Sequence, residues 1–104
     1  MVYRNRWKDT ERQVAKMLGV TRNPNDGTHK PDIDYGPFNI EHKCRSSVPK
    51  WFSKAMTQAV RASQENTTPV LVISVPQQGV GTERYAVMRF KDWLDWHGPS
   101  ERSE

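Results

Sequence analysis

The sequence predicts an α/β sandwich with a central mixed β-sheet flanked by helices. Three observations support this fold class. Apolar residues recur at helical spacing in several segments, two short alternating segments flank a Gly-Pro break, and residues 70–75 form a run rich in β-branched residues. The expected element order is α–β–β–α–β–β–α. We expect one domain over residues 1–104, with a basic lead-in at 1–8 and a polar tail at 98–104.

The first helix is expected between Asp9, which suits an N-cap, and Gly19, which suits the C′ position. Its buried stripe comprises Val14, Ala15 and Leu18. Glu11 precedes this stripe at helical spacing, so its carboxylate lies at the core-facing edge, where it is costly unless it is paired or binds a metal. The alternative is that Glu11 simply lies in the first turn, where a carboxylate favours the helix dipole.

Residues 20–30 are polar and rich in turn-forming residues, so they form a loop or an irregular first strand. A tight hairpin is predicted after them, with Gly36-Pro37 as its two-residue turn. This register opposes Tyr35 to Phe38, Ile33 to Ile40 and Asp32 to Glu41. One face then carries Asp32, Asp34, Asn39, Glu41 and Lys43. Opposed carboxylates repel each other. A divalent cation between them would turn that repulsion into coordination.

The second half of the chain supplies the remaining elements. A helix is expected from Lys50 to about Glu65, with an apolar stripe of Phe52, Ala55, Met56, Ala59 and Val60. The run Val70–Val75 is typical of a strand covered on both faces. A loop at residues 77–82, a strand over Glu83–Phe90 and a helix over Lys91–His97 complete the chain.

Composition narrows the class of protein. The net charge of +4 and pI near 9.5 favour a polyanionic partner. Hydrophobic residues make up only 35% of the chain, so the core is thin and dimerisation would help to stabilise it. The single Cys44 allows no internal disulfide, which favours a reducing cytoplasm. The longest apolar run is too short to span a membrane, and no secretory signal is visible.

The motif Pro31-Asp32, followed by Glu41-His42-Lys43 and preceded by Glu11 on the leading helix, resembles the PD-(D/E)XK nuclease superfamily. Within it the chain resembles the archaeal-type and phage-type Holliday junction resolvases. The resemblance implies a restriction-endonuclease-like fold and hydrolysis of phosphodiesters with magnesium or manganese. It also implies a homodimer that cuts branched DNA in the cytoplasm of a bacterial or phage-infected cell.

The expected chemistry assigns a role to each motif residue. Asp32 and Glu41 are the direct metal ligands, the backbone carbonyl of His42 supplies another, and Glu11 completes the first shell or binds a second ion. Lys43 orients the attacking water and offsets phosphate charge, and its replacement by Arg should not be conservative.

Two residues leave this assignment open. Asp34 shares the face of Asp32 and replaces it as the ligand if the hairpin loop is longer than two residues. The resemblance implies that Gln58 contacts the catalytic Lys or water, against the alternative of a surface residue. The side chain of His42 is expected to point away from the acids into the opposite layer.

Basic and hydroxyl side chains around the motif are the expected DNA contacts, since cations neutralise phosphates. They are Arg4, Arg6, Lys8, Arg12, Lys30, Arg45, Ser46, Ser47, Lys50 and Lys54. Two other functions compete with junction resolution: a flap or single-strand nuclease of the same superfamily, and a basic DNA-binding module without catalysis. The second is disfavoured because the acid cluster repels DNA unless metal is bound.

Overall fold

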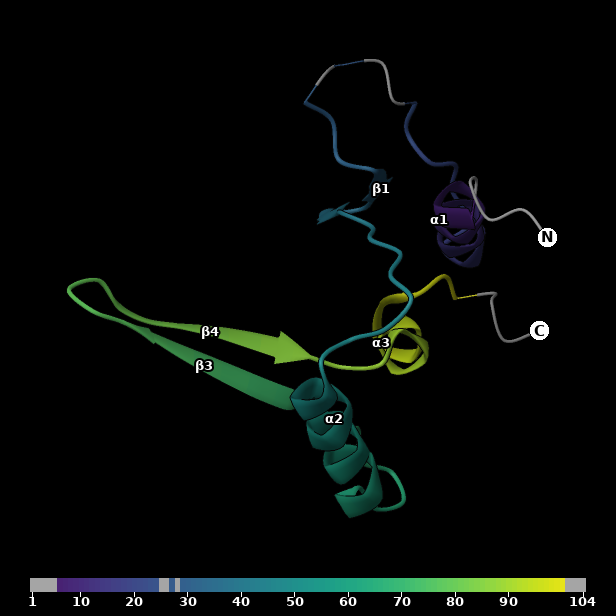
Figure 1. Ribbon diagram of the computed structural model, residues 1–104. Coiled ribbons are helices and arrows are strands. Elements are labelled where there is room, and N and C mark those ends of the chain that lie inside the picture. Colours follow the sequence, from purple (N-terminus) through teal and green to yellow (C-terminus); the bar gives the residue numbers. More distant parts are fainter. Residues whose placement is uncertain (1–5, 25–26, 28, 101–104) are drawn as a thin grey trace. The chain divides into compact units, whose positions relative to one another are not determined.

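The chain folds into three helices and two antiparallel hairpins, seen in a computed structural model that describes residues 6–24, 27 and 29–100 (Figure 1). The order is α1 (Arg6–Met17), β1 (Ile33–Tyr35), β2 (Phe38–Ile40), α2 (Lys50–Ala62), β3 (Leu71–Gln77), β4 (Gly81–Val87) and α3 (Phe90–His97). The mixed α/β class and the predicted element order are confirmed. The described strands form two sheets of two strands each, β1-β2 and β3-β4. The central mixed sheet stays a prediction.

These elements belong to two compact units. The first comprises the described parts of Met1–Ser46 and His97–Glu104, and the second is Ser47–Trp96. The assignment of the whole chain to a single domain stays a prediction. Most of the expected lead-in and tail lies outside the described residues.

Helix α1 begins earlier than the sequence predicts. It starts at Arg6, so Asp9 lies in the first turn and not at the N-cap. There the Asp9 carboxylate still favours the helix dipole, and it accepts a hydrogen bond of 3.3 Å from Arg12. The predicted C-terminal end is confirmed. Gly19 has a φ of 74° and donates to the carbonyl of Lys16, while the N–H of Val20 donates to that of Ala15, which is the Schellman pattern.

The core of the first unit is small and lies where the apolar stripe of α1 predicts it. Ala15, Leu18 and Ile33 are buried, and Val14 is half-buried. Glu11 is buried beside them, with only 3% of its surface exposed. A buried charge of this kind needs a partner, which in this structure is Arg22.

The β1–β2 hairpin has the predicted register. Ile33 pairs with Ile40, Asp34 with Asn39 and Tyr35 with Phe38, so the turn is Gly36-Pro37. Gly36 has a φ of 56°, and Pro37 cannot adopt a positive φ, which together favour a type II′ turn over type I′. The alternation of faces is also confirmed, because Asp34 and Asn39 are exposed while the other four strand residues are buried or half-buried.

Replacing Gly36 with Ala is expected to destabilise the chain by about 1–2 kcal/mol, the cost of a left-handed conformation for an L-residue. Within the described part of the chain, no atom outside Gly36 and its two sequence neighbours lies within 4 Å of the added Cβ, so the cost comes from the backbone conformation. Urea unfolding measures it. Gly36→Asn is the matched control and should lose less, because Asn tolerates a positive φ better than Ala. Equal stability of the Ala variant and the wild type would contradict the turn assignment.

Helix α2 begins at the predicted residue, Lys50, and ends at Ala62, three positions before the expected end. Ser63 is extended, and its N–H donates back to Val60. Thr67 then closes a turn on Gln64 around Asn66, whose φ is 70°. The predicted apolar stripe forms the less exposed face of α2, although none of its residues is fully buried.

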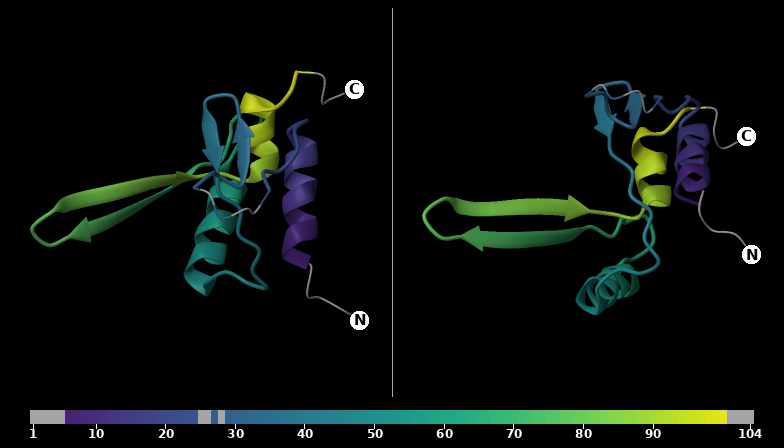
Figure 2. Two further views of the ribbon diagram at one scale, coloured as in Figure 1. Left: turned by 90° about the horizontal axis from the view of Figure 1, so that it is seen from above. Right: turned by 45° about the horizontal axis from the view of Figure 1, so that its top comes forward.

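The β3–β4 hairpin differs from the prediction in two respects. Its strands run to Gln77 and from Gly81, so the expected loop is a tight turn in which Val80 donates to the carbonyl of Gln77. In both views of Figure 2 the hairpin extends away from α2. β3 is not covered on both faces, since Val72 is 59% exposed. A run of β-branched residues predicts a strand, but two strands alone supply no cover.

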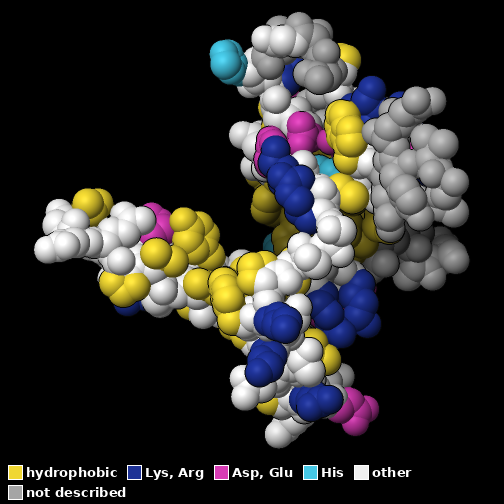
Figure 3. All heavy atoms as spheres, viewed as in Figure 1, with side chains coloured by type: hydrophobic (Ala, Val, Ile, Leu, Met, Phe, Trp, Pro, Cys, Tyr) yellow, Lys and Arg dark blue, Asp and Glu magenta, His cyan; other side chains and the backbone are white. Residues whose placement is uncertain are grey.

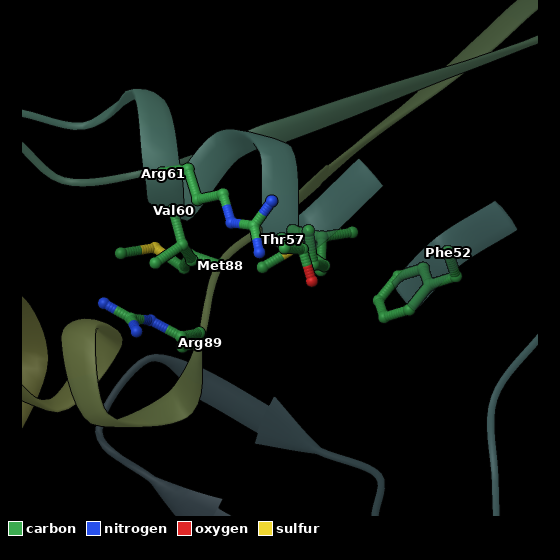
Figure 4. A pocket seen from close by; sticks show the side chains of 8 residues that line it. Phe52, Thr57, Val60, Arg61, Met88 and Arg89 are labelled. Atoms are coloured by element: carbon green, nitrogen blue, oxygen red, sulfur yellow. The ribbon is translucent and has the colours of Figure 1, made fainter. Parts of the chain in front are cut away.

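An apolar groove of about 490 Å³ lies in the second unit. Figure 4 shows residues of α2 on one side of it and Met88 and Arg89 on the other. Arg89 donates to Asp92 at 2.8 Å in the first turn of α3, which begins one residue before the predicted start. None of the described helices is long and apolar enough to cross a bilayer.

Candidate active site

The motif acids gather in one pocket of the first unit. The pocket has a volume of about 200 Å³ and is lined by Trp7, Glu11, Asp32, Glu41, His42, Lys43, Cys44 and Arg45. Asp32 directly precedes β1 and Glu41 directly follows β2, so the confirmed hairpin register brings them to the same end. The structure therefore places Glu11, Asp32, Glu41 and Lys43 around the same pocket, as the sequence predicts.

Backbone groups hold Asp32 in place. Its carboxylate Oδ2 accepts a hydrogen bond of 2.8 Å from the N–H of His42. Its carbonyl accepts one of 2.8 Å from the N–H of Asn23. Asp32 is half-buried, so it remains accessible to a ligand while its position is fixed.

Asp34, the alternative ligand, does not line the pocket. Its side chain is exposed, and its Oδ2 accepts a hydrogen bond of 3.0 Å from Asn23 Nδ2. The hairpin loop has two residues, which is the condition under which the sequence favours Asp32. Of the two aspartates, only Asp32 is available to a ligand in the pocket.

Glu11 is the acid whose surroundings the sequence did not reveal. Arg22 Nη1 donates to its Oε2 at 2.8 Å, and both side chains are largely buried. Arg22 was not among the predicted site residues. It lies in a polar loop eleven positions after Glu11, and no periodicity or motif connects the two. The ion pair compensates the burial of Glu11, so this acid is already neutralised in part.

His42 corrects a prediction. Its side chain lines the pocket, and its Nδ1 lies 3.8 Å from Glu11 Oε1, whereas the sequence places it away from the acids. Burial still alternates along this segment, because the side chains of Glu41 and Lys43 are about 65% exposed whereas that of His42 is 13% exposed. His42 lies near an acid because Glu11 is on the buried side. Among the described residues, the buried Nδ1 has no hydrogen-bond partner. Ligation by the His42 carbonyl stays a prediction.

Glu41 and Lys43 form the solvent-facing wall. Lys43 Nζ lies 3.2 Å from Glu41 Oε2, and both side chains are about 65% exposed. An exposed pair of this kind contributes little to stability. Both groups are therefore free to exchange this contact for a cation, a water molecule or a phosphate.

The carboxylates of Asp32 and Glu41 suit a hard cation such as magnesium. Within residues 6–24, 27 and 29–100, no three His, Cys, Asp or Glu side chains gather closely enough to form a complete metal site. Magnesium retains several waters and needs only one or two protein carboxylates beside a substrate phosphate. The open pocket with its two accessible acids fits that requirement, whereas it does not fit a closed zinc site.

The predicted auxiliary residues are distributed over both units. Gln58 is exposed on α2, where it lines a shallow groove with Lys54 and Arg61, and its role beside Lys43 stays a prediction. Lys8 lies over the Trp7 ring, 5.4 Å from its centroid, while Arg12 pairs with Asp9. The exposed candidates are Lys30, Arg45, Ser46, Ser47, Lys50 and Lys54. Arg4 and the side chain of Arg6 lie outside the described residues.

Positive charge is spread over both units. In the second unit, Figure 3 shows Lys and Arg side chains along α2, a helix that contains no acidic residue. In the first unit, Lys43 and Arg45 line the pocket itself. The acids are thus accompanied by cations that suit a phosphate-bearing ligand.

Comparisons with family models, curated proteins and solved structures found no match to this chain. The main features of the pocket are two accessible acids at one end of a hairpin, a third acid buried beside them, and an exposed amine.

Proposed function

We propose that this chain is a metal-dependent DNA endonuclease that resolves four-way junctions by hydrolysing phosphodiesters. The observation that carries the proposal is the pocket in which the hairpin places Asp32, Glu41 and Lys43 together. Two acids at the same end of a hairpin repel each other, and the Lys43 ammonium, 3.2 Å from Glu41, offsets part of that charge. A metal ion would offset the remainder and connect the acids to a phosphodiester.

The charge and accessibility of each pocket side chain indicate the role it would have in catalysis. Asp32 and Glu41 would hold magnesium or manganese, which supplies a more acidic water and neutralises charge on the phosphate. Lys43 would leave Glu41 to orient the attacking water and to offset phosphate charge, since its side chain is exposed and its pairing with Glu41 contributes little to stability. Asp32 would keep its position throughout, because the N–H of His42 holds its carboxylate.

The finer fold assignment belongs to the same proposal. We propose a restriction-endonuclease-like α/β sandwich with one central mixed sheet, of the PD-(D/E)XK superfamily. Its support is the confirmed element order and the strongly apolar sequence of β3. The resolvase assignment also includes a homodimer in the cytoplasm. Its support is the exposed apolar surface of the second unit, including Trp51, Tyr85 and Trp96, which a second copy would cover.

The test is cleavage of a labelled mobile four-way junction with and without magnesium, next to linear, flap and single-stranded DNA of the same sequence. Paired symmetric nicks in the junction alone are expected, and only with metal. Preference for the flap or single strand would support the second candidate, a repair nuclease with the same pocket. Binding of DNA without cleavage of any substrate in magnesium or manganese would contradict the enzyme and favour a binding module.

A further inference from the structure

Two consecutive loop residues, Arg22 and Asn23, each hold a different acidic segment of the pocket. Arg22 donates to the Glu11 carboxylate on α1. The N–H of Asn23 donates to the carbonyl of Asp32, 2.8 Å away. This short segment therefore connects helix α1, which carries Glu11, with Asp32, the residue directly before β1.

The side chain of Asn23 makes two further hydrogen bonds. Its Nδ2 donates to the carbonyl of Pro31 at 2.9 Å and to Asp34 Oδ2 at 3.0 Å. Both partners are acceptors, which only the nitrogen end of the amide can satisfy. The first bond fixes the backbone directly before Asp32. The second occupies the Asp34 carboxylate outside the pocket.

Asp32 and Asp34 carry the same carboxylate on the same face of the hairpin, two positions apart. Strand alternation does not distinguish them. In the structure, the Asp32 carboxylate is bound by the N–H of His42 and lines the pocket, whereas the Asp34 carboxylate is bound by Asn23 and does not. The difference between the two acids is thus set by their hydrogen-bond partners.

We propose that Asn23 is a positioning residue that makes Asp32, and not Asp34, the aspartate that serves in the pocket beside Glu41. This inference rests on the proposed function. Asn23 acts through two contacts: it fixes the peptide that leads into Asp32, and it binds the competing carboxylate. Hydrogen bonds from neighbouring residues orient the side chains that bind a metal. Loss of such a bond typically reduces metal affinity or activity by about 10- to 100-fold.

The test replaces Asn23 with Asp, which has the same shape and no amide donor. The new carboxylate faces the Pro31 carbonyl and the Asp34 carboxylate, so both contacts become repulsive. For junction cleavage we expect kcat to fall by about 10- to 100-fold, with KM changed by no more than about twofold. Binding of Mn²⁺ to the DNA-free protein, measured by electron paramagnetic resonance, should weaken by a similar factor.

A double variant separates positioning from general damage. In N23D/D34N the amide at position 34 can donate to the carboxylate at position 23, which restores their hydrogen bond with the donor and acceptor exchanged. We expect kcat and Mn²⁺ affinity to recover in part, by at least about threefold over N23D, because the contact with the Pro31 carbonyl stays lost. D34N alone should cleave as the wild type does. A merely structural role would lower the melting temperature without this pattern of recovery.

Three results would overturn the inference: full activity of N23D, no recovery in N23D/D34N, or loss of cleavage in D34N. If N23D does not fold, N23A removes the same hydrogen bonds without adding a charge, and full activity of N23A overturns the inference equally. D32N distinguishes a failure of the proposed function from a failure of the role assigned to Asn23. Cleavage by D32N at the wild-type rate contradicts the proposed function itself, whereas an inactive D32N beside a fully active N23D contradicts only the role of Asn23.

Discussion

Replacing Asp32 with Asn is expected to slow junction cleavage by about 100- to 1,000-fold, the effect typical of removing a group that stabilises charge in the transition state. Asn has the same shape but lacks the negative charge that a hard cation requires. Its side-chain oxygen can still accept the hydrogen bond that the His42 N–H donates to Asp32 Oδ2, so the local fold should persist. Single-turnover cleavage of a labelled junction in magnesium measures the loss.

Junction binding by this variant should equal or exceed that of the wild type, because removing a negative charge beside the phosphates reduces repulsion. Glu41→Gln should behave in the same way, since Glu41 lines the same pocket. Asp9→Asn is the matched control. Asp9 is an exposed acid on α1 that does not line the pocket, so its loss should leave the rate unchanged. Equal rates for D32N and D9N would refute the site.

The features that the sequence predicted correctly are those set by neighbours along the chain. The Gly36-Pro37 turn fixes the register of β1 with β2, and that register determines where Asp32 and Glu41 lie. Gly19 ends α1 because it adopts a positive φ without strain. Both are local properties, and the first was sufficient to predict that Asp32 and Glu41 lie at the same end of the hairpin.

The features that the sequence did not reveal depend on contacts between distant segments. Arg22 and Asn23 lie in a polar loop without periodicity, and only the fold shows that they contact Glu11, Asp32 and Asp34. His42 lies on the buried side, opposite Glu41 and Lys43, but that side also holds Glu11, whose contact with His42 the sequence did not reveal. In each case the residue type was visible but its partner was not.

The second unit shows the same limit for burial. The β-branched run of β3 predicts a strand correctly, because branched side chains favour an extended backbone. It does not predict what covers that strand, since cover comes from other elements or other chains. The early start of α1 has a similar cause. Asp9 suits both an N-cap and a first-turn position, and the chain before it decides between them.

Removing the partner of Glu11 is expected to have the largest effect on stability. Replacing Arg22 with Met retains most of the side-chain volume but leaves the Glu11 carboxylate buried without its 2.8 Å ion pair. An uncompensated buried charge typically costs about 3–5 kcal/mol. For a domain of this size, each kcal/mol lowers the melting temperature by about 4–8 °C, so a decrease of at least about 12 °C is expected. Thermal unfolding followed by circular dichroism measures it.

The double variant E11M/R22M tests whether charge or packing causes this loss. It removes both buried ionic groups and fills their space with apolar side chains, a change that is often neutral or stabilising. We therefore expect it to recover most of the stability that R22M loses. If both variants were equally unstable, the ion pair would not be the cause, and packing around Arg22 would explain the loss instead. Recovery would show that Arg22 stabilises the chain only because it compensates the buried charge of Glu11. Apolar side chains would then serve equally well for stability, so stability alone would not explain why this position is an acid.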